Sequence, residues 1–347
     1  MKEYIHGGDI YRHPDVLDFS ANINPLGTPP AVVQAAKDSM EWICHYPDAC
    51  QEKLKQALAA YEQVPVEWLI CGNGAAELIF ALVQAVKPKR ALVMAPTFAE
   101  YAQALEAVGC EVDREILKKE DGFTLQRTIL EKLQKEDLQM VFLCNPNNPT
   151  GILINPKLLR EIVTICEKKN IYLVVDECFL DFVSEPEVHT LKGELEGKQY
   201  LFLLKAFTKR YAMAGLRLGY GITSSETLME KMEQQLQPWN VSMPAQEAGV
   251  EALKETAYVE KARELIFQEQ AFLKDGLKAF GYPVLDSQAN YVFFEGEPDL
   301  YEKLLEEGVM IRDCSNYPGL WKGCYRIAVK LHNENEQLLR KIRKVRR

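Results

Sequence analysis

Residues 140–176 run MVFLCNPNNPTGILINPKLLREIVTICEKKNIYLVVD. The apolar run Met140–Cys144 predicts a buried strand, the amphipathic stretch Leu158–Lys169 predicts a helix, and Ile171–Val175 predicts a second strand. Strands that are continuous apolar runs, separated by a helix, are typical of a parallel sheet that helices cover on both faces. This stretch therefore predicts an α/β fold.

The same alternation continues on both sides of this stretch. Before it, the apolar runs Trp68–Cys71 and Arg90–Ala95 predict strands, and after it Tyr200–Leu204 predicts another. Helices are expected at Glu77–Val86 and Phe98–Val108. The sheet is therefore expected to span most of the first two thirds of the chain.

From about residue 226 the pattern changes to long charged helices and short strands. Such a separate block of strands paired with helices predicts a second, smaller α+β domain. Its expected elements are the helices Glu226–Gln237, Gln246–Phe280, Leu300–Glu307 and Asn333–Lys344, and the strands Tyr291–Phe294, Val309–Arg312 and Tyr325–Val329.

The composition limits the class of protein. The chain has 347 residues with a formal net charge of −9, and 47% of its residues are hydrophobic and 26% charged. These values are typical of a soluble globular chain long enough for two domains, and they exclude disordered and fibrous proteins. The acidic balance argues against a nucleic-acid partner, and we interpret the basic cluster Arg340–Arg347 as a solvated helix end.

The sequence also carries information on location and metal binding. No stretch approaches the ~20 apolar residues of a membrane span, and Met1–Asp9 lacks the apolar core of a signal peptide. The nine cysteines form no CxxC, and the five histidines form no HxxxH or HxH. We therefore expect a cytoplasmic protein with no membrane partner, buried reduced cysteines and no metal site.

Polar residues follow the predicted strands, at the edge where a parallel sheet binds its ligand. Residues 72–77 (GNGAAE) join a strand to a helix, so their amides form either an anion cradle or a plain tight turn. Residues 145–151 (NPNNPTG) present asparagines on a loop that two prolines stiffen. Asp176 ends a strand and is either a functional carboxylate or the cap of the next helix.

Lys209 follows another buried strand, in the segment KAFTKRYAMAGLRLG (residues 205–219). Hydrophobic neighbours would lower its pKa and make it a nucleophile that forms a Schiff base, although most lysines are exposed loop residues and Lys205 and Arg210 are candidates too. A nucleophilic lysine, a carboxylate for a ring nitrogen, an amide and an anion cradle with an arginine are the groups that pyridoxal phosphate requires.

In combination, these motifs resemble the fold-type I pyridoxal-phosphate enzymes of the class I/II aminotransferase group over essentially the whole chain. The resemblance rests on residues 208–219 (TKRYAMAGLRLG) and on the NPNNPTG loop. It implies a three-layer α/β/α large domain with a mostly parallel sheet over residues 26–240, and a smaller α+β domain from residues 1–25 and 241–347. It also implies pyridoxal 5'-phosphate as cofactor and a homodimer with shared active sites.

The resemblance further implies a role for each residue around the cofactor ring. Lys209 would be the Schiff-base lysine and Asp176 the partner of the pyridine nitrogen. Asn148 would donate to the ring oxygen, and Phe98 would stack on the ring.

A second set of residues would bind the cofactor phosphate. Ala75 and Ala76 would offer backbone amides, and Thr208 and Arg217 would add side chains. Tyr46 would reach the phosphate from the other subunit.

Two branches of this group fit best, the threonine-phosphate decarboxylases of cobalamin side-chain synthesis and the histidinol-phosphate aminotransferases. The segments His6–Gly8 and Leu17–Gly27 (LDFSANINPLG) are similar to the decarboxylases. Phe179 favours the same branch, because the aminotransferases generally place a tyrosine there. This branch implies that the phosphate and carboxylate of a small phosphorylated amino acid are bound by His6, Asn22, Asn148, Arg312 and Arg326. Without the resemblance, we would interpret the two arginines as surface ion pairs.

We therefore expect decarboxylation of L-threonine O-3-phosphate to (R)-1-amino-2-propanol O-2-phosphate. An arginine that holds the substrate carboxylate in the ring plane would favour transamination, whereas arginines engaged by a phosphate leave the carboxylate out of plane, so that CO2 departs. Transamination of histidinol phosphate is the first alternative. Serine phosphate is the second, because it lacks one methyl, which a pocket discriminates by only ~1–3 kcal/mol.

Two positions depart from the family pattern. Ala206 stands where a Ser or Thr usually bonds the cofactor phosphate, so cofactor affinity falls unless Thr208 or Lys205 compensates. The segment between Gly8 and Leu17 is short for a decarboxylase and lies beside His6.

Two other classes of protein are disfavoured. A dinucleotide-binding oxidoreductase is disfavoured because the glycine-rich segment lacks a third glycine, and a non-catalytic regulator because the acidic chain has no DNA-binding appendage.

Overall fold

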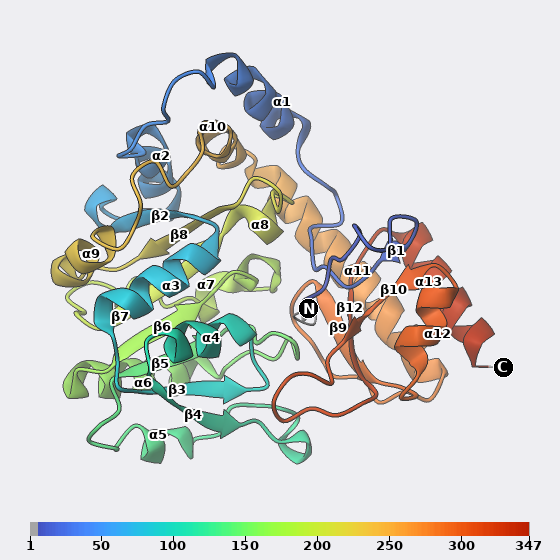
Figure 1. Cartoon of the computed structure of the whole chain (residues 1–347). Coiled ribbons are helices and arrows are strands. Elements are labelled where there is room, and N and C mark those ends of the chain that lie inside the picture. The colour runs from blue at the N-terminus through green and yellow to red at the C-terminus, as the bar shows by residue number, and fades with distance from the viewer. Residues whose placement is uncertain (1–5, 347) are drawn as a thin grey trace.

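A seven-stranded sheet forms the centre of the computed structural model, which describes residues 6–346 (Figure 1). The strands lie in the order β2–β8–β7–β6–β5–β3–β4. Their bounds are Leu69–Asn73 (β2), Arg90–Ala95 (β3), Glu111–Ile116 (β4), Met140–Cys144 (β5), Tyr172–Asp176 (β6), Leu201–Ala206 (β7) and Leu218–Ile222 (β8). The neighbours from β4 to β7 are parallel, whereas β8 runs antiparallel to both β7 and β2. The predicted mostly parallel sheet is thereby confirmed.

Helices on both faces of this sheet complete the three layers. The crossovers through α3 (Ala75–Val86) and α4 (Ala99–Ala107) move toward the β4 edge, whereas those through α5 (Ile129–Lys132) and α6 (Pro156–Lys169) move back. Because such crossovers are right-handed, α3 and α4 share one face, in front of the sheet in Figure 1, and α5 and α6 cover the other.

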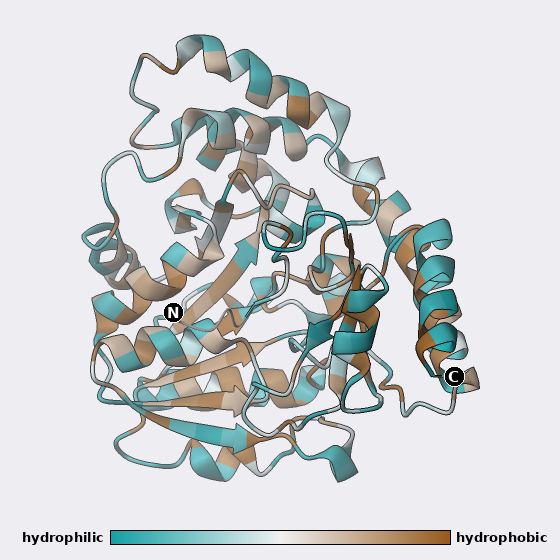
Figure 2. Ribbon diagram, turned by 45° about the vertical axis from the view of Figure 1, so that its right-hand side comes forward, coloured by the Kyte–Doolittle hydropathy of each residue, from teal (hydrophilic) through white to brown (hydrophobic). Residues whose placement is uncertain are grey.

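Local sequence explains where these elements begin and end. Asn155 caps α6, since its side chain accepts hydrogen bonds from the amides of Lys157 and Leu158, and Asn170 ends the helix in a left-handed conformation. The strands β5 and β7 are buried at every position. Figure 2 shows mostly hydrophobic strands in the sheet and a mixture of polar and apolar residues on the helices around it. The edge strand β4 (EVDREI) is half exposed and charged, so its sequence gave no apolar run to recognise.

The C-terminal part forms the smaller α+β unit. Its antiparallel sheet has the order β11–β12–β9. The bounds are Tyr291–Glu295 (β9), Val309–Met310 (β10), Arg312–Asp313 (β11) and Cys324–Ala328 (β12), with helices α11 (Thr256–Ala279), α12 (Leu300–Glu306) and α13 (His332–Val345). Strand β1 (Leu17–Asp18) pairs with β10. The N-terminal segment therefore belongs to the same unit as the C-terminal part, although the two are far apart in the sequence. A second hydrophobic core fills it, with Phe19, Val292, Phe294, Ile327 and Leu338 among its members. The boundaries at residues 25/26 and 240/241 stay a prediction.

Two predicted elements of this region are wrong. The single helix expected at Gln246–Phe280 is two helices, α10 (Met243–Ala252) and α11, because the chain turns at residues 253–255 so that α10 packs on α1 (Pro30–Ser39) and α2 (Glu52–Glu62). The strand expected at Val309–Arg312 is split into β10 and β11, because Ile311 turns into the core between two different partner strands.

The cysteines only partly follow the expectation from sequence. All nine are free thiols, of which seven are buried, whereas Cys44 and Cys50 are exposed.

No helix within residues 6–346 has the length and apolar character needed to cross a bilayer. The same residues include no group of three or more His, Cys, Asp or Glu side chains that could hold a metal ion.

Candidate active site

A cavity of about 430 Å³ opens at the carboxyl ends of the parallel strands, where the large sheet meets the smaller unit. It brings together every residue of the predicted site except one. The predicted residues that line it are His6, Asn22, Ala75, Ala76, Phe98, Asn148, Asp176, Thr208, Lys209, Arg217, Arg312 and Arg326.

Tyr46 is the predicted residue that does not line this cavity. Its side chain is 77% exposed, and its ring stacks on that of Trp239 with the centroids 4.5 Å apart. Since its proposed role belongs to a second subunit, that role stays a prediction.

Lys209 lies in the short helix α8 (Phe207–Arg210), directly after strand β7. Burial lowers the pKa of its amine to about 8, and the positive charges of Arg326 and Arg217 act in the same direction. A substantial share of the amine is therefore neutral near physiological pH, as a nucleophile requires.

The two other cationic candidates near Lys209 are held in ion pairs away from the cavity. The ammonium of Lys205 lies 3.2 Å from Glu62 and 3.6 Å from Glu177, and the guanidinium of Arg210 pairs with Asp181. Lys205 therefore cannot replace the hydroxyl that Ala206 lacks.

Asp176 lies buried at the end of strand β6 and is fixed by two donors. The hydroxyl of Tyr101 donates to Oδ2 at 2.6 Å, and the amide of Cys178 donates to Oδ1 at 2.9 Å. Burial raises the pKa of this carboxyl, while both hydrogen bonds and the charge of Lys209 oppose the rise. Phe179, and not Asp176, occupies the N-cap position of the next helical turn, so the alternative role of Asp176 as a helix cap does not hold.

An anion cradle forms where helix α3 begins beside Arg217. Gly74 precedes the helix with a φ of +80° and provides no side-chain cap, so the first amides of α3 are open to a ligand. A residue with a Cβ would be strained at this positive φ, which explains why a glycine stands there, and a Cβ would also displace the Arg217 guanidinium. Helix amides and a guanidinium suit a phosphate group.

In the wall of the cavity, Asn148 and Arg326 are joined by a hydrogen bond. An Nη of Arg326 donates to Oδ1 of Asn148, and its other Nη donates to the carbonyl of Ser20 at 2.8 Å. Because its oxygen is occupied, Asn148 has its NH2 group available for a ligand. Arg326 is buried, so the interpretation as a surface ion pair is wrong for this residue.

Several buried polar atoms of this wall lack a hydrogen-bond partner among the described residues. They are both amide atoms of Asn22 and the Nε of Arg326. Leaving such groups unsatisfied costs about 1–3 kcal/mol each, so this wall is built for a polar ligand. Arg312 stands beside it, with its guanidinium 5.2 Å from the ring centre of Tyr317.

Two residues that the sequence analysis missed belong to the site. Tyr101 lies three positions after Phe98, which directly precedes α4, and this helical spacing could have shown that the two rings lie close together. Glu100 also lines the cavity, and its Oε1 lies 3.2 Å from Nε2 of His6. No motif marks this glutamate in a single sequence.

Known proteins share this architecture over nearly the whole chain. Residues 14–342 match the family model for aminotransferases of class I and II. A threonine-phosphate decarboxylase of Salmonella typhimurium is 41% identical over 98% of this chain and 96% of its own length. A histidinol-phosphate aminotransferase of an Anaeromyxobacter species is 33% identical over 95% of this chain and 90% of its own length. The crystal structure of the histidinol-phosphate aminotransferase of Clostridium acetobutylicum matches with a TM-score of 0.89 and 30% identity, covering 95% of this chain and 99% of that one. The chain therefore belongs to the class I and II aminotransferase family.

Proposed function

We propose that this chain is a pyridoxal-phosphate-dependent decarboxylase that converts L-threonine O-3-phosphate to (R)-1-amino-2-propanol O-2-phosphate and CO2. The observation that carries the proposal is that His6, Asn22, Arg312 and Arg326 line the same cavity as Lys209. It offers cationic and amide groups to two anionic groups of one small substrate, as a phosphorylated amino acid requires. The 41% identity to a threonine-phosphate decarboxylase supports this substrate.

The residues of the cavity fit pyridoxal phosphate. Lys209 would carry its aldehyde carbon, Asp176 would face the ring nitrogen, and the cradle of Ala75, Ala76 and Arg217 would hold its phosphate. Thr208, Asn148 and Phe98 would complete the contacts. When bound, pyridoxal phosphate accepts the electron pair that the leaving carboxylate releases at Cα.

The protein itself controls protons and orientation in this proposal. Tyr101 and the Cys178 amide fix the Asp176 carboxylate, so that it can accept a hydrogen bond from a protonated ring nitrogen. Lys209 Nζ, with a pKa of about 8, would hold the proton that Cα receives after CO2 leaves.

The choice between decarboxylation and transamination rests on where the substrate carboxylate is held. If Arg312 and His6 bind the phosphate group, the Asn148–Arg326 pair would be left to hold the carboxylate, and the position of the carboxylate there would decide which bond at Cα breaks. Phe179 lines the cavity without a hydroxyl, and the ammonium of Lys209 lies 5.8 Å from its ring centre. Phe179 thus leaves that face of the site apolar.

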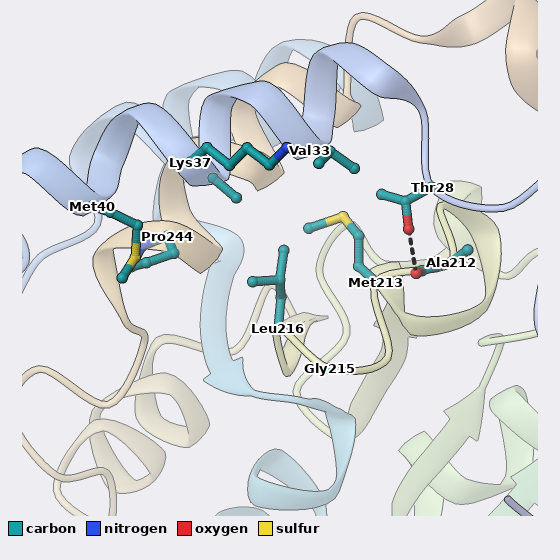
Figure 3. Close-up of a pocket in the computed structure, with 10 residues that line it drawn as sticks. Thr28, Val33, Lys37, Met40, Ala212, Met213, Gly215, Leu216 and Pro244 are labelled. Carbon is teal, nitrogen blue, oxygen red and sulfur yellow. Dashed lines mark hydrogen bonds between the residues drawn. The ribbon is translucent and has the colours of Figure 1, made fainter. Parts of the chain in front are cut away.

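We also propose a homodimer with shared active sites. A second cavity of about 420 Å³, mostly apolar, lies between α1 and the segment 212–216 (Figure 3). Val33, Met40 and Leu216 line it, and Leu216 directly precedes the cavity residue Arg217. Exposed apolar side chains follow shortly after α1, at Trp42, Ile43 and Tyr46, and the ring of Tyr46 stacks on that of the exposed Trp239. Such a surface is typical of an interface between two copies of the chain. The proposed role of Tyr46 requires that the second copy bring its Tyr46 to the neighbouring cofactor cradle.

Three experiments test these proposals. The holoenzyme should show a visible absorption band that Lys209→Ala abolishes and that Arg340→Gln, on the exposed face of α13, leaves intact. Turnover should be faster with threonine phosphate than with serine phosphate, and absent with histidinol phosphate plus 2-oxoglutarate; transamination of histidinol phosphate would refute the decarboxylase. Sedimentation should give a dimer, and Trp42→Glu should give a monomer.

A further inference from the structure

Asn240 lies at the centre of a hydrogen-bond network that joins three segments far apart in the sequence. It stands between α9 (Glu226–Glu233) and α10, and the residue is half-buried. Its Nδ2 donates to Oε2 of Glu77 at 2.7 Å and to the carbonyl of Cys71 at 3.2 Å. Its Oδ1 accepts a hydrogen bond from Nε2 of Gln51 at 3.2 Å. The side chain thereby links the residue that precedes α2 to strand β2 and to the first turn of α3, where the anion cradle lies.

An asparagine matches the donors and acceptors at this position. The two hydrogens of Nδ2 face a carboxylate and a carbonyl, which only accept, whereas Oδ1 faces the NH2 group of Gln51, which only donates. That NH2 group gives its other hydrogen to the carbonyl of Ala49 at 2.9 Å. An aspartate at position 240 would instead place an acceptor against the carboxylate of Glu77 and the carbonyl of Cys71.

Glu77 brings a negative charge into the first turn of α3, beside the proposed phosphate site. Its Oε2 also accepts from the amide of Asn73 at 2.7 Å, and it lies over Gly72, where a Cβ would come within 3.1 Å of it. Ala75 and Ala76 line the cavity, whereas Glu77 does not. Because a helix N-terminus attracts a carboxylate as well as a phosphate, the side chain of Glu77 is a built-in competitor for the cradle.

The cradle depends strongly on its backbone amides. Ala75, Ala76 and Ala206 line the cavity without a side-chain donor. The amides at the start of α3 therefore supply a large part of the attraction for a phosphate, and a carboxylate that covered them would weaken it.

We propose that Asn240 is a positioning residue that holds the Glu77 carboxylate on the Asn73 amide and thereby keeps the first amides of α3 available to the cofactor phosphate. The inference rests on the proposed function for the identity of the cofactor. Without the hydrogen bond from Nδ2, the carboxylate would turn toward those amides, where the helix N-terminus stabilises a negative charge. The loss would fall on the phosphate of the cofactor and not on its ring or aldehyde, which other parts of the cavity would hold.

Binding of the cofactor with and without its phosphate measures this role. We would titrate the full-length, cofactor-free protein at pH 8 with pyridoxal phosphate and, separately, with pyridoxal, and follow visible absorbance and tryptophan fluorescence. Asn240→Asp should bind pyridoxal phosphate about tenfold more weakly than the wild type, because a charge-assisted hydrogen bond becomes a contact between two carboxylates. Its affinity for pyridoxal should stay within about twofold of the wild type. A merely structural role of Asn240 would weaken the binding of both ligands alike.

Matched variants separate the hydrogen bond from the added charge. Asn155→Asp makes the same charge change at the exposed N-cap of α6, where an aspartate still accepts, so both affinities should match those of the wild type. Asn240→Asp combined with Glu77→Gln exchanges the amide and the carboxylate between the two positions, so the hydrogen bond re-forms in the opposite direction and part of the affinity for pyridoxal phosphate should return. If Asn240→Asp does not fold, as judged by thermal unfolding, Asn240→Ala removes the same donor without adding a charge and should show the same selective loss.

The outcomes distinguish this inference from the proposed function. Equal weakening for both ligands, or unchanged affinity for pyridoxal phosphate in Asn240→Asp, would overturn the inference. A double variant that binds pyridoxal phosphate no better than Asn240→Asp alone would also overturn it. If the wild type binds neither ligand, the proposed cofactor is wrong and this inference falls with it. If the binding results hold but threonine phosphate is not decarboxylated, only the proposed function fails.

Discussion

Lys209 should react as a free amine at a pH where ordinary lysines are almost fully protonated. Its pKa is about 8, compared with 10.5 for a solvated lysine. At pH 8 about half of Lys209 is therefore neutral, against about 0.3% of an ordinary lysine, which makes it roughly 150-fold more reactive at equal access. Burial is the main cause, and the charge of Arg326 is the next.

The assay is competitive acetylation of the cofactor-free protein between pH 6 and 11, with the Lys209 peptide quantified by mass spectrometry. Its labelling should reach half of its maximum near pH 8. Arg326→Gln should move this midpoint upward, because it removes the positive charge that lowers the pKa of Lys209 most after burial, whereas Arg340→Gln should not. Lys205 should stay unlabelled, since it is buried in its ion pair with Glu62. A midpoint near 10.5 for the wild type would refute the account of how Lys209 becomes nucleophilic.

Three further outcomes follow from the same geometry. Burial alone would raise the pKa of Glu62, but Lys205 and neighbouring cations hold it at about 2, which corresponds to about 3 kcal/mol. Urea unfolding of Glu62→Gln should show this loss of unfolding free energy at pH 7. The difference from the wild type should shrink as the pH falls from 4.5 toward 2, because the wild type then loses the same stabilisation. The control Glu52→Gln, at an exposed position, should change the unfolding free energy by under about 0.5 kcal/mol. Asp176→Asn should lower kcat about 10²–10³-fold with the cofactor still bound, as steady-state kinetics and absorbance would show; unchanged kcat would contradict its pairing with the ring nitrogen. Arg326→Gln should raise KM for the phosphorylated substrate about 10–100-fold, and a KM within twofold of wild type would remove it from the substrate site.

The fold was predictable wherever burial left a simple pattern. Strands such as Met140–Cys144 are apolar throughout because helices cover both of their faces, and the sequence analysis placed them correctly. The charged edge strand Glu111–Ile116 escaped notice because one side of it is not covered by a neighbouring strand. The break between α10 and α11 also escaped notice, since no proline or glycine marks residues 253–255 and only packing on α1 and α2 requires the turn.

The motif residues of the candidate site were predictable from the sequence, but the residues that contact and orient them were not. Lys209, Asp176 and Arg217 stand in segments whose order of residues identifies the family. The isolated glutamate Glu100 and the tyrosine Tyr101 contact side chains that are distant in sequence, namely His6 and Asp176. Such contacts depend on tertiary distances, and a single sequence does not encode them in any local pattern.

The central claim is that the protein decarboxylates a phosphorylated amino acid in the cavity around Lys209. The most direct test incubates the holoenzyme with L-threonine O-3-phosphate labelled at the carboxyl carbon, without any 2-oxo acid, and measures labelled CO2 together with the phosphorylated product. We predict one CO2 for each (R)-1-amino-2-propanol O-2-phosphate formed, over many turnovers. Absence of CO2, with amino-group transfer to 2-oxoglutarate once it is added, would contradict the account.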